Sequence, residues 1–295
     1  MLTEYLRQAT GSLGSHILKA LVQAGRFNVT VLARAPLKEN PSGAQVKVVD
    51  FESTLALTAA LEGQDALVDA TSVPDPTFAL RLMDAAVAAR VYRIIPAEFS
   101  GDPKNSKARS LPPFAGKAKA FEYLQKLAST SSLTWTLISN NAFLDWGLRT
   151  AFLGIDLQKK SIEYLNDGNM TIPYTTLSSV GIAVANALGQ PEETKNRICY
   201  ICNAQMTQRE LANRARQALG EDGWQAEDLD MGAELQKAMD ELQAGRVTFE
   251  VIRDIIRFSI STPGYVQKFE QTDNELLGVR AMDYKEIEDL IRGIA

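Results

Sequence analysis

Short, continuous apolar runs alternate with segments of helical periodicity through the first half of the chain. The short runs are typical of strands buried on both faces, and the periodic segments are typical of helices with one apolar face. The pattern predicts strands at residues 28–33, 46–49, 66–70, 92–95 and 134–138, and helices at residues 13–24, 54–61, 77–90 and 116–128.

This alternation predicts an α/β fold with a doubly wound parallel sheet, because parallel strands need crossover connections whose helices cover both faces. Ligands of such sheets bind at the carboxyl ends of the strands, near the point where the strand order reverses. The residues that directly follow the predicted strands are therefore candidate site residues. They are Arg34, Asp50, residues 71–74, residues 96–99 and residues 139–143.

The alternation becomes irregular after about residue 150. Strands are predicted at residues 162–165, 170–173 and 197–201, helices at residues 177–188, 208–219 and 231–260, and a loop at residues 221–223. We expect residues 1–150 to form a nucleotide-binding domain and residues 151–295 to form a smaller lobe that covers the sheet edge and binds substrate. Some strands of that lobe are expected to rejoin the main sheet.

Composition narrows the function classes. The chain has 295 residues, of which 45% are hydrophobic and 23% charged, as in ordinary globular proteins, and its net charge is −5. No basic run suits nucleic acid, and no apolar segment is long enough for a signal peptide or a membrane span. We expect a cytoplasmic protein that binds neither nucleic acid nor membrane.

Histidine and cysteine are too scarce for most metal sites and catalytic triads. The chain has one histidine, His16, and two cysteines, Cys199 and Cys202. His16 is interpreted as a residue on a helix face. The two cysteines fall in or next to a predicted strand, where side chains alternate between faces, so we expect buried, reduced thiols and no metal.

A glycine-containing turn precedes the first predicted helix. Glycines there let the backbone approach a diphosphate, and the helix N-terminus offers free N–H groups to the anion. Gln8 stands where the dinucleotide motif has its first glycine, and the preceding residues, with Glu4 and Arg7, form a poor buried strand. The first strand is therefore expected to be irregular or truncated. The predicted phosphate-binding residues are Thr10, Gly11, Ser12, Leu13 and Gly14.

The residue after the second predicted strand points to NADP(H). An acidic residue at that place would bind the ribose hydroxyl of NAD, whereas Arg34 would pair with the 2′-phosphate of NADP. Lys38 is close enough in sequence to assist, and Asp50 follows the next strand. The alternative is that Arg34 is a solvated surface residue.

Several segments, taken in order, carry a family resemblance. They are Ala-Thr-Gly-Ser-Leu-Gly (9–14), residues 29–34, Arg-Ile-Ile-Pro-Ala-Glu-Phe (93–99), Pro-Phe-Ala-Gly-Lys (113–117), Asn-Ala-Phe-Leu-Asp-Trp-Gly (141–147) and Asn-Glu-Leu-Leu-Gly (274–278). On these residues the sequence resembles the NmrA-like and isoflavone-reductase-like branch of the atypical short-chain dehydrogenases, in particular its fungal members.

The resemblance implies an NADP(H)-binding Rossmann domain with a small C-terminal substrate lobe. It implies that Lys117 contacts the nicotinamide ribose and assists proton transfer. It also implies that two segments after strands flank the cofactor, and these supply the candidates Thr71, Ser72, Val73 and Pro96.

The chemistry of the candidate site rests on Lys117. None of the eight tyrosines has a lysine four residues later, so the tyrosine mechanism of ordinary short-chain dehydrogenases has no support. Lys117 is near the start of a predicted helix, where the dipole and partial burial lower its pKa and suit it to acid–base work. Glu98 and Asp145 are further catalytic candidates, although each could instead cap a helix or close a loop.

A set of aromatic residues is a candidate lining for a ring-bearing substrate, although core packing explains most single aromatic residues. With the amide that follows the strand at residues 134–138, the predicted substrate residues are Phe99, Asn141, Phe143, Trp146, Phe152 and Tyr174.

Three functions remain open from the sequence. The first is an NADP(H)-dependent reductase of a small aromatic or polyketide-like metabolite. The second is a cyclase or isomerase that keeps NADP(H) as a structural cofactor. The third is a nucleotide-sensing regulator that binds a protein partner without catalysis. The sequence leaves homodimer formation open.

Overall fold

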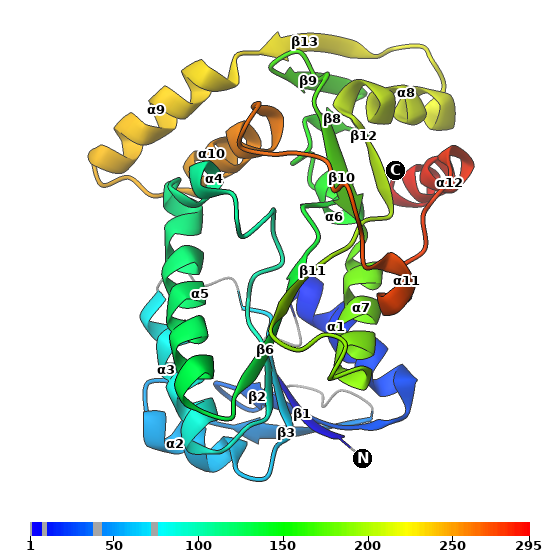
Figure 1. Ribbon diagram of the computed structural model, residues 1–295. Helices are drawn as coiled ribbons and strands as arrows, with labels where there is room; N and C mark the ends of the chain where they lie inside the picture. The colour runs from blue at the N-terminus through cyan, green and yellow to red at the C-terminus, as the bar shows by residue number, and fades with distance from the viewer. Residues whose placement is uncertain (1, 8–10, 38–42, 72–75) are drawn as a thin grey trace.

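The computed structural model describes the chain except residues 1, 8–10, 38–42 and 72–75 (Figure 1). Most strands coincide with apolar runs of the sequence. In chain order the strands are β1 (Leu2–Arg7), β2 (Phe27–Ala33), β3 (Ala44–Val48), β4 (Ala66–Asp69), β5 (Arg93–Ile95), β6 (Thr134–Ser139), β7 (Ala142–Phe143), β8 (Ile155–Asp156), β9 (Ser161–Leu165), β10 (Thr171–Thr175), β11 (Arg197–Tyr200), β12 (Ala204–Thr207) and β13 (Gln225–Leu229).

Seven strands form one parallel sheet in the order β11-β6-β5-β4-β1-β2-β3. The chain builds outward from β1 to β3 on one side and then continues from β4 to β11 on the other. The order therefore reverses between β1 and β4. This arrangement confirms the predicted doubly wound α/β fold, and it places the reversal point beside the turn at Gly11.

Helices cover both faces of the large sheet, as Figure 1 shows. In chain order the helices of the described residues are α1 (Ser12–Ala24), α2 (Thr54–Leu61), α3 (Pro76–Ala88), α4 (Ser106–Arg109), α5 (Pro112–Thr130), α6 (Leu144–Arg149), α7 (Leu177–Gly189), α8 (Gln208–Leu219), α9 (Met231–Gln243), α10 (Phe249–Ser261), α11 (Asn274–Leu277) and α12 (Tyr284–Ile294).

Each face of the large sheet has its own apolar core. On one face the periodic apolar residues of α1, among them Ile17 and Leu21, pack with α7 against the sheet. On the other face α2, α3 and α5 cover the sheet around Leu67, Leu82 and Leu124. Burial of these side chains stabilises the fold by about 25 cal/mol for each Å² of apolar surface removed from water.

Two three-stranded sheets lie beyond the carboxyl edge of the large sheet (Figure 1). Their orders are β12-β10-β7 and β13-β9-β8, and α6, α8, α10 and α12 pack around them. Two elements after residue 150 are part of the first unit instead: β11 is a strand of the large sheet, and α7 packs on one face of it. That residues 151–295 act as a separate substrate lobe stays a prediction.

The irregularity expected of the first strand is not found in β1, and its expected truncation stays a prediction. The backbone of β1 pairs in parallel with β2 along all six residues and with β4 along four. A strand between two partners is held by hydrogen bonds on both sides, so it tolerates a polar sequence that the apolar rule for central strands disfavours.

One further prediction in the second half is corrected, and one strand there was not predicted. The expected helix at residues 231–260 is two helices, because Gly245 takes a left-handed φ of 75° and Thr248 caps α10 by accepting from the N–H of Val251. Strand β13 pairs in parallel with β9 although its side chains are mostly exposed. A polar, solvent-facing strand has no apolar run that would reveal it.

Two helices of the first face approach closely at Gly181 of α7. A Cβ at this position would lie 2.5 Å from the carbonyl oxygen of His16 in α1. Backbone atoms cannot move aside as a flexible side chain can, so the glycine sets the spacing of the two helices.

We therefore expect Gly181→Ala to lower the free energy of unfolding by about 1–3 kcal/mol. The matched control is Gly293→Ala in α12, where a Cβ would meet nothing within 4 Å. That control is expected to be neutral or slightly stabilising, because alanine favours helix. Urea unfolding of both variants measures the difference, and equal stability of the two would refute the close contact.

Candidate cofactor and active site

The N-terminus of α1 lies at the carboxyl edge of the large sheet, directly after the central strand β1. Gly11 is its N-cap, with φ −76° and ψ 168°, and no described side chain caps the first turn. The first backbone N–H groups of a helix have no intrahelical acceptor, and the helix dipole favours an anion there. These residues fit a nucleotide diphosphate. Thr10 and Gln8 lie outside the described residues.

Arg34 and Asp50 lie at the same edge, because β2 and β3 pair in parallel with Ala33 opposite Val48. Both side chains are exposed. The carboxylate of Asp50 accepts a hydrogen bond from the N–H of Glu52 at 2.9 Å, which closes the turn toward α2. Arg34 thus stands one residue beyond β2, where the sequence predicts the 2′-phosphate. Lys38 lies outside the described residues.

The ends of β4 and β5 form the next part of this edge. Asp69, the last residue of β4, is 2% exposed, and its carboxylate accepts from the N–H of Thr71 at 3.0 Å. Pro96 is buried after β5, and its carbonyl accepts from the N–H of Glu98 at 2.7 Å. Thr71 and Pro96 thus follow β4 and β5, on one side of the reversal point. Ser72 and Val73 lie outside the described residues.

Lys117 reaches this edge from the second turn of α5. Its ammonium group donates a hydrogen bond to the backbone carbonyl of Glu98. Burial lowers the pKa of Lys117, and the positive charge of Arg109 lowers it further, while Glu98 and Asp69 act in the opposite direction. A lysine with a lowered pKa can release and take up a proton near neutral pH.

Glu98 is buried in a charged cluster with Arg109. One oxygen of its carboxylate lies 2.8 Å from Nη2 of Arg109 and accepts from the hydroxyl of Ser100 at 2.5 Å. The side chain of Glu98 is 3% exposed and that of Arg109 is 9% exposed. These contacts hold the loop after β5 in place. They thereby position the backbone carbonyl of Glu98, which accepts the hydrogen bond from Lys117.

Asp145 and Asn141 join the loop after β6 to the smaller sheets. The carboxylate of Asp145 accepts from the N–H of Leu177 at 3.0 Å, so it caps the start of α7. The amide of Asn141 donates to the carbonyl of Pro173 at 3.0 Å, and its backbone has a left-handed φ of 51°. Both side chains hold the segments that surround the candidate site.

The predicted aromatic residues do not form one lining. Phe99 is 7% exposed and belongs to the core cluster under α1 and α7, against which Phe143 also packs. Trp146 and Phe152 contact each other with ring centroids 5.1 Å apart. Tyr174 is 1% exposed, lies on β10 and belongs to the core cluster against which Phe152 packs.

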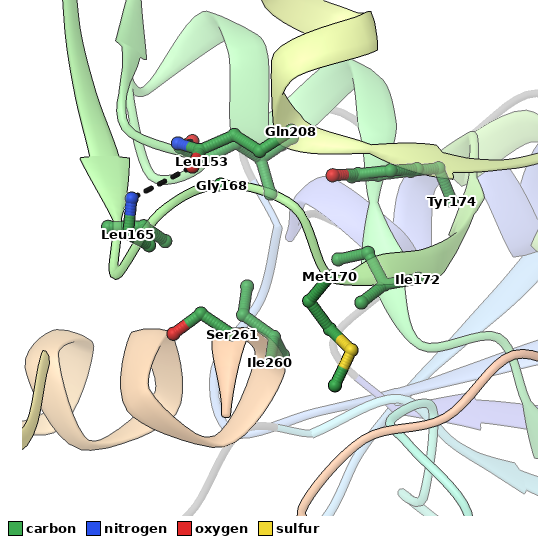
Figure 2. Close-up of a pocket in the computed structure, with 9 residues that line it drawn as sticks. All are labelled: Leu153, Leu165, Gly168, Met170, Ile172, Tyr174, Gln208, Ile260 and Ser261. Carbon is green, nitrogen blue, oxygen red and sulfur yellow. Dashed lines mark hydrogen bonds between the residues drawn. The ribbon is translucent and has the colours of Figure 1, made fainter. Parts of the chain in front are cut away.

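Figure 2 shows a pocket between α10, β10 and the turn that precedes β10. Its cavity volume is about 20 Å³, which is room for about one water molecule. The apolar walls come from Leu153, Leu165, Met170, Ile172 and Ile260.

Two polar side chains of this pocket differ in their bonding. The amide of Gln208 is satisfied by the backbone of Leu153, Glu163 and Leu165. The hydroxyl of Tyr174 points into the pocket (Figure 2), and burial raises its pKa, so it stays protonated. Of the six predicted substrate residues, Tyr174 is the one that lines this pocket.

The scarce histidine and cysteines occupy structural positions. The ring of His16 contacts the carbonyl of Ser12 one helical turn earlier, as expected of a helix-face residue. Cys199 and Cys202 are buried free thiols, and burial raises their pKa to about 12 and about 11. Within the described residues no group of three or more His, Cys, Asp or Glu side chains could hold a metal ion.

Residues 9–163, which include α1, β2 to β6 and Lys117, match the family of NAD(P)H-binding proteins. The chain belongs to this family. The oxidoreductase aprR of Aspergillus flavus is 32% identical over 286 residues, which are 95% of each chain. The predicted nicotinamide nucleotide cofactor is thereby confirmed.

Solved structures confirm the fold of this NAD(P)H-binding protein. Isoflavone reductase matches with a TM-score of 0.75 and 17% identity over 99% of both chains. AtPrR2 with NADP+ and (+)-pinoresinol matches with a TM-score of 0.75 and 18% identity over 100% of this chain and 98% of that one. The predicted resemblance to isoflavone-reductase-like proteins is confirmed. In the described part of the chain, no helix is long and apolar enough to cross a membrane.

The sequence prediction does not include Asp69, Ser100 or Arg109. Asp69 is a charged residue inside an apolar run, and that contrast is a signal that could have revealed it. Arg109 follows Lys104 and Lys107 in a polar segment, where nothing in the pattern distinguishes it. Its place beside Glu98 is visible only in the fold.

Desolvation of the Lys117 ammonium group destabilises the folded protein at neutral pH. We expect Lys117→Met to raise the free energy of unfolding at neutral pH by about 1 kcal/mol, because a buried charge is replaced by an apolar chain. The folded-state pKa of Lys117 lies below its usual value of 10.5, so wild-type stability rises with pH between those values. The advantage of the variant should therefore shrink as the pH rises.

Denaturant unfolding at several pH values measures this difference. Lys119→Met, two residues along the same helix, is the control, because Lys119 is exposed. A Lys117→Met variant less stable than that control across the whole pH range would contradict the prediction.

Proposed function

We propose that the protein is an NADP(H)-dependent reductase of a small, ring-bearing, weakly polar molecule of aromatic or polyketide type. The observation that carries the proposal is the half-buried Lys117, held at the sheet edge where α1 presents its N-terminal N–H groups. The family match over residues 9–163 and the name of the relative from Aspergillus flavus, an oxidoreductase, support it.

The nucleotide supplies a hydride when it is bound. The first turn of α1 holds the diphosphate, Arg34 and Lys38 pair with the 2′-phosphate, and Asp50 supports that side of the site. Thr71, Ser72, Val73 and Pro96 flank the nucleotide along the ends of β4 and β5. The sequence adds Thr10 to the candidates for the diphosphate.

The ammonium group of Lys117 gives its proton to the substrate as the hydride adds, so a carbonyl and the two hydrogens become an alcohol. Glu98 acts through its carbonyl, which orients the ammonium group. Asp145 acts by capping α7 and fixing the loop after β6. Lys117 regains its proton from solvent after the product leaves.

The substrate side of the proposal uses the loop after β6 and the pocket of Figure 2. Asn141 and the packed aromatic residues Phe99 and Phe143 shape the inner wall. Trp146, Phe152 and Tyr174 face the smaller sheets, and the Tyr174 hydroxyl offers one hydrogen bond to an otherwise apolar ligand. The apolar walls favour a ring-bearing molecule with few polar groups, and the cavity must widen to admit it, because its present volume holds about one water molecule.

The proton-transfer role predicts a specific loss of rate. Lys117→Met should slow NADPH oxidation with a panel of aromatic ketones, quinones and enones by about 100-fold or more, since a positioned acid contributes that much. Lys119→Met should leave the rate unchanged. Because the proton donor must be charged, the wild-type rate should fall as the pH rises through the lowered pKa of Lys117.

The assay follows the absorbance of NADPH together with chromatography of the products. Equal rates in the Lys117→Met variant and the wild type would remove Lys117 from the reaction. Product formed without consumption of NADPH would overturn hydride transfer itself.

The choice of cofactor gives a second test. We expect Arg34→Ser to weaken NADPH binding by about 10-fold or more and to leave NADH binding unchanged, because only NADPH carries the 2′-phosphate. Titration calorimetry measures both affinities. The control is Arg246→Ser, an arginine paired with Glu241 between α9 and α10. An equal loss of affinity for NADPH and NADH would show that Arg34 does not bind the 2′-phosphate.

A further inference from the structure

Arg109 is a buried arginine whose hydrogen bonds are incomplete. Its side chain is 9% exposed, and one terminal nitrogen, Nη1, is buried without any hydrogen-bond partner within the described part of the chain. Nη2 lies 2.8 Å from the Glu98 carboxylate, but the angle of approach is not that of a hydrogen bond. The guanidinium is therefore paired by charge alone.

Two other buried arginines show how this chain satisfies such a group. Arg93, 2% exposed, donates to three threonine hydroxyls and the carbonyl of Pro191. Arg257, 4% exposed, donates to two carbonyls and to Glu163. A buried donor without an acceptor destabilises the fold, so the difference at Arg109 calls for a reason other than stability.

The location of Arg109 supplies that reason. It ends α4, in the segment between the carboxyl end of β5 and the start of α5. Arg109 contacts the carboxylate of Glu98, and Lys117 contacts the carbonyl of the same residue. Two cations thus converge on one residue of the candidate active site.

We propose that Arg109 binds an acidic oxygen of the substrate, a carboxylate or the oxygen of an acidic enol or phenol. This inference rests on the proposed function for the position of the substrate, and it narrows the substrate class to ring-bearing molecules that carry such an oxygen. Nη1 of the guanidinium is a donor without a partner among the described residues, and a charge-assisted hydrogen bond to an anionic oxygen would satisfy it. Burial of the site strengthens this attraction.

The binding test needs no turnover. The probes are benzoate and its neutral analogue benzamide, titrated by calorimetry into the protein saturated with NADPH. We expect wild-type protein to bind benzoate at least ten-fold more tightly than benzamide. Arg109→Gln should remove this preference, and Arg109→Lys should keep part of it, because the charge remains while the fork is lost.

Three results would overturn the inference. They are a wild-type protein that does not prefer benzoate, an Arg109→Gln variant that keeps the preference, and a variant that loses NADPH affinity instead. The last would show that the guanidinium serves the nucleotide. Failure of hydride transfer with the benzoate preference intact would refute the proposed function and leave the anion site standing.

Removing Arg109 alone leaves Glu98 buried without its counter-charge, and that variant could fail to fold. The double variant Glu98→Gln and Arg109→Gln removes both charges together and preserves the size of both side chains. It should fold and bind NADPH, and it should show no preference between the probes. A retained preference in the double variant would also overturn the inference.

Discussion

Parallel pairing of β1 with β4 on one side and with β2 on the other is the constraint on which the rest of the site depends. It places the reversal of strand order beside the first helix, so the N-terminus of α1 opens onto the edge where β4 and β5 also end. Arg34, Thr71 and Pro96 reach that edge because the strands they follow run in the same direction. The nucleotide site is in this sense a property of the topology more than of any single side chain.

The edge is also where the protein concentrates buried charge. Asp69, Glu98, Arg109 and Lys117 act on one another there, with two negative and two positive side chains. Such a cluster stabilises a fold less than apolar residues of the same size. Its value lies in the lowered pKa of Lys117, which a solvated lysine does not have.

The elements that the sequence predicted best are those in which the apolar run or the helical periodicity lies within the element itself. Strands β2 and β4 are continuous apolar runs, and α2 and α8 have the bounds that their periodicity predicts. The turn at Gly11, Arg34 and Lys117 could be named because motif and resemblance mark them. Their roles stay predictions, because the fold fixes where a side chain lies and not what it binds.

The rest depends on contacts between distant segments. Strand β1 is held by two neighbours in spite of its polar residues, and β13 pairs with β9 without an apolar run. The predicted aromatic residues are divided between two apolar clusters, with Phe99 in the core under α1 and α7 and Tyr174 among the smaller sheets, and their role in binding substrate stays a prediction. The periodicity of one segment does not show which distant segment it will contact.

The close approach of α1 and α7 at Gly181 couples the stability of the two halves of the chain. The helix whose beginning would receive the diphosphate rests, along its flank, on a helix from beyond residue 150. Occupation of the nucleotide site and cohesion of the later half are therefore linked thermodynamically: whatever tightens one strengthens the other. A fragment ending at residue 150 lacks α7 and would expose the apolar residues of α1 that α7 covers. We therefore do not expect the family segment, residues 9–163, to fold on its own.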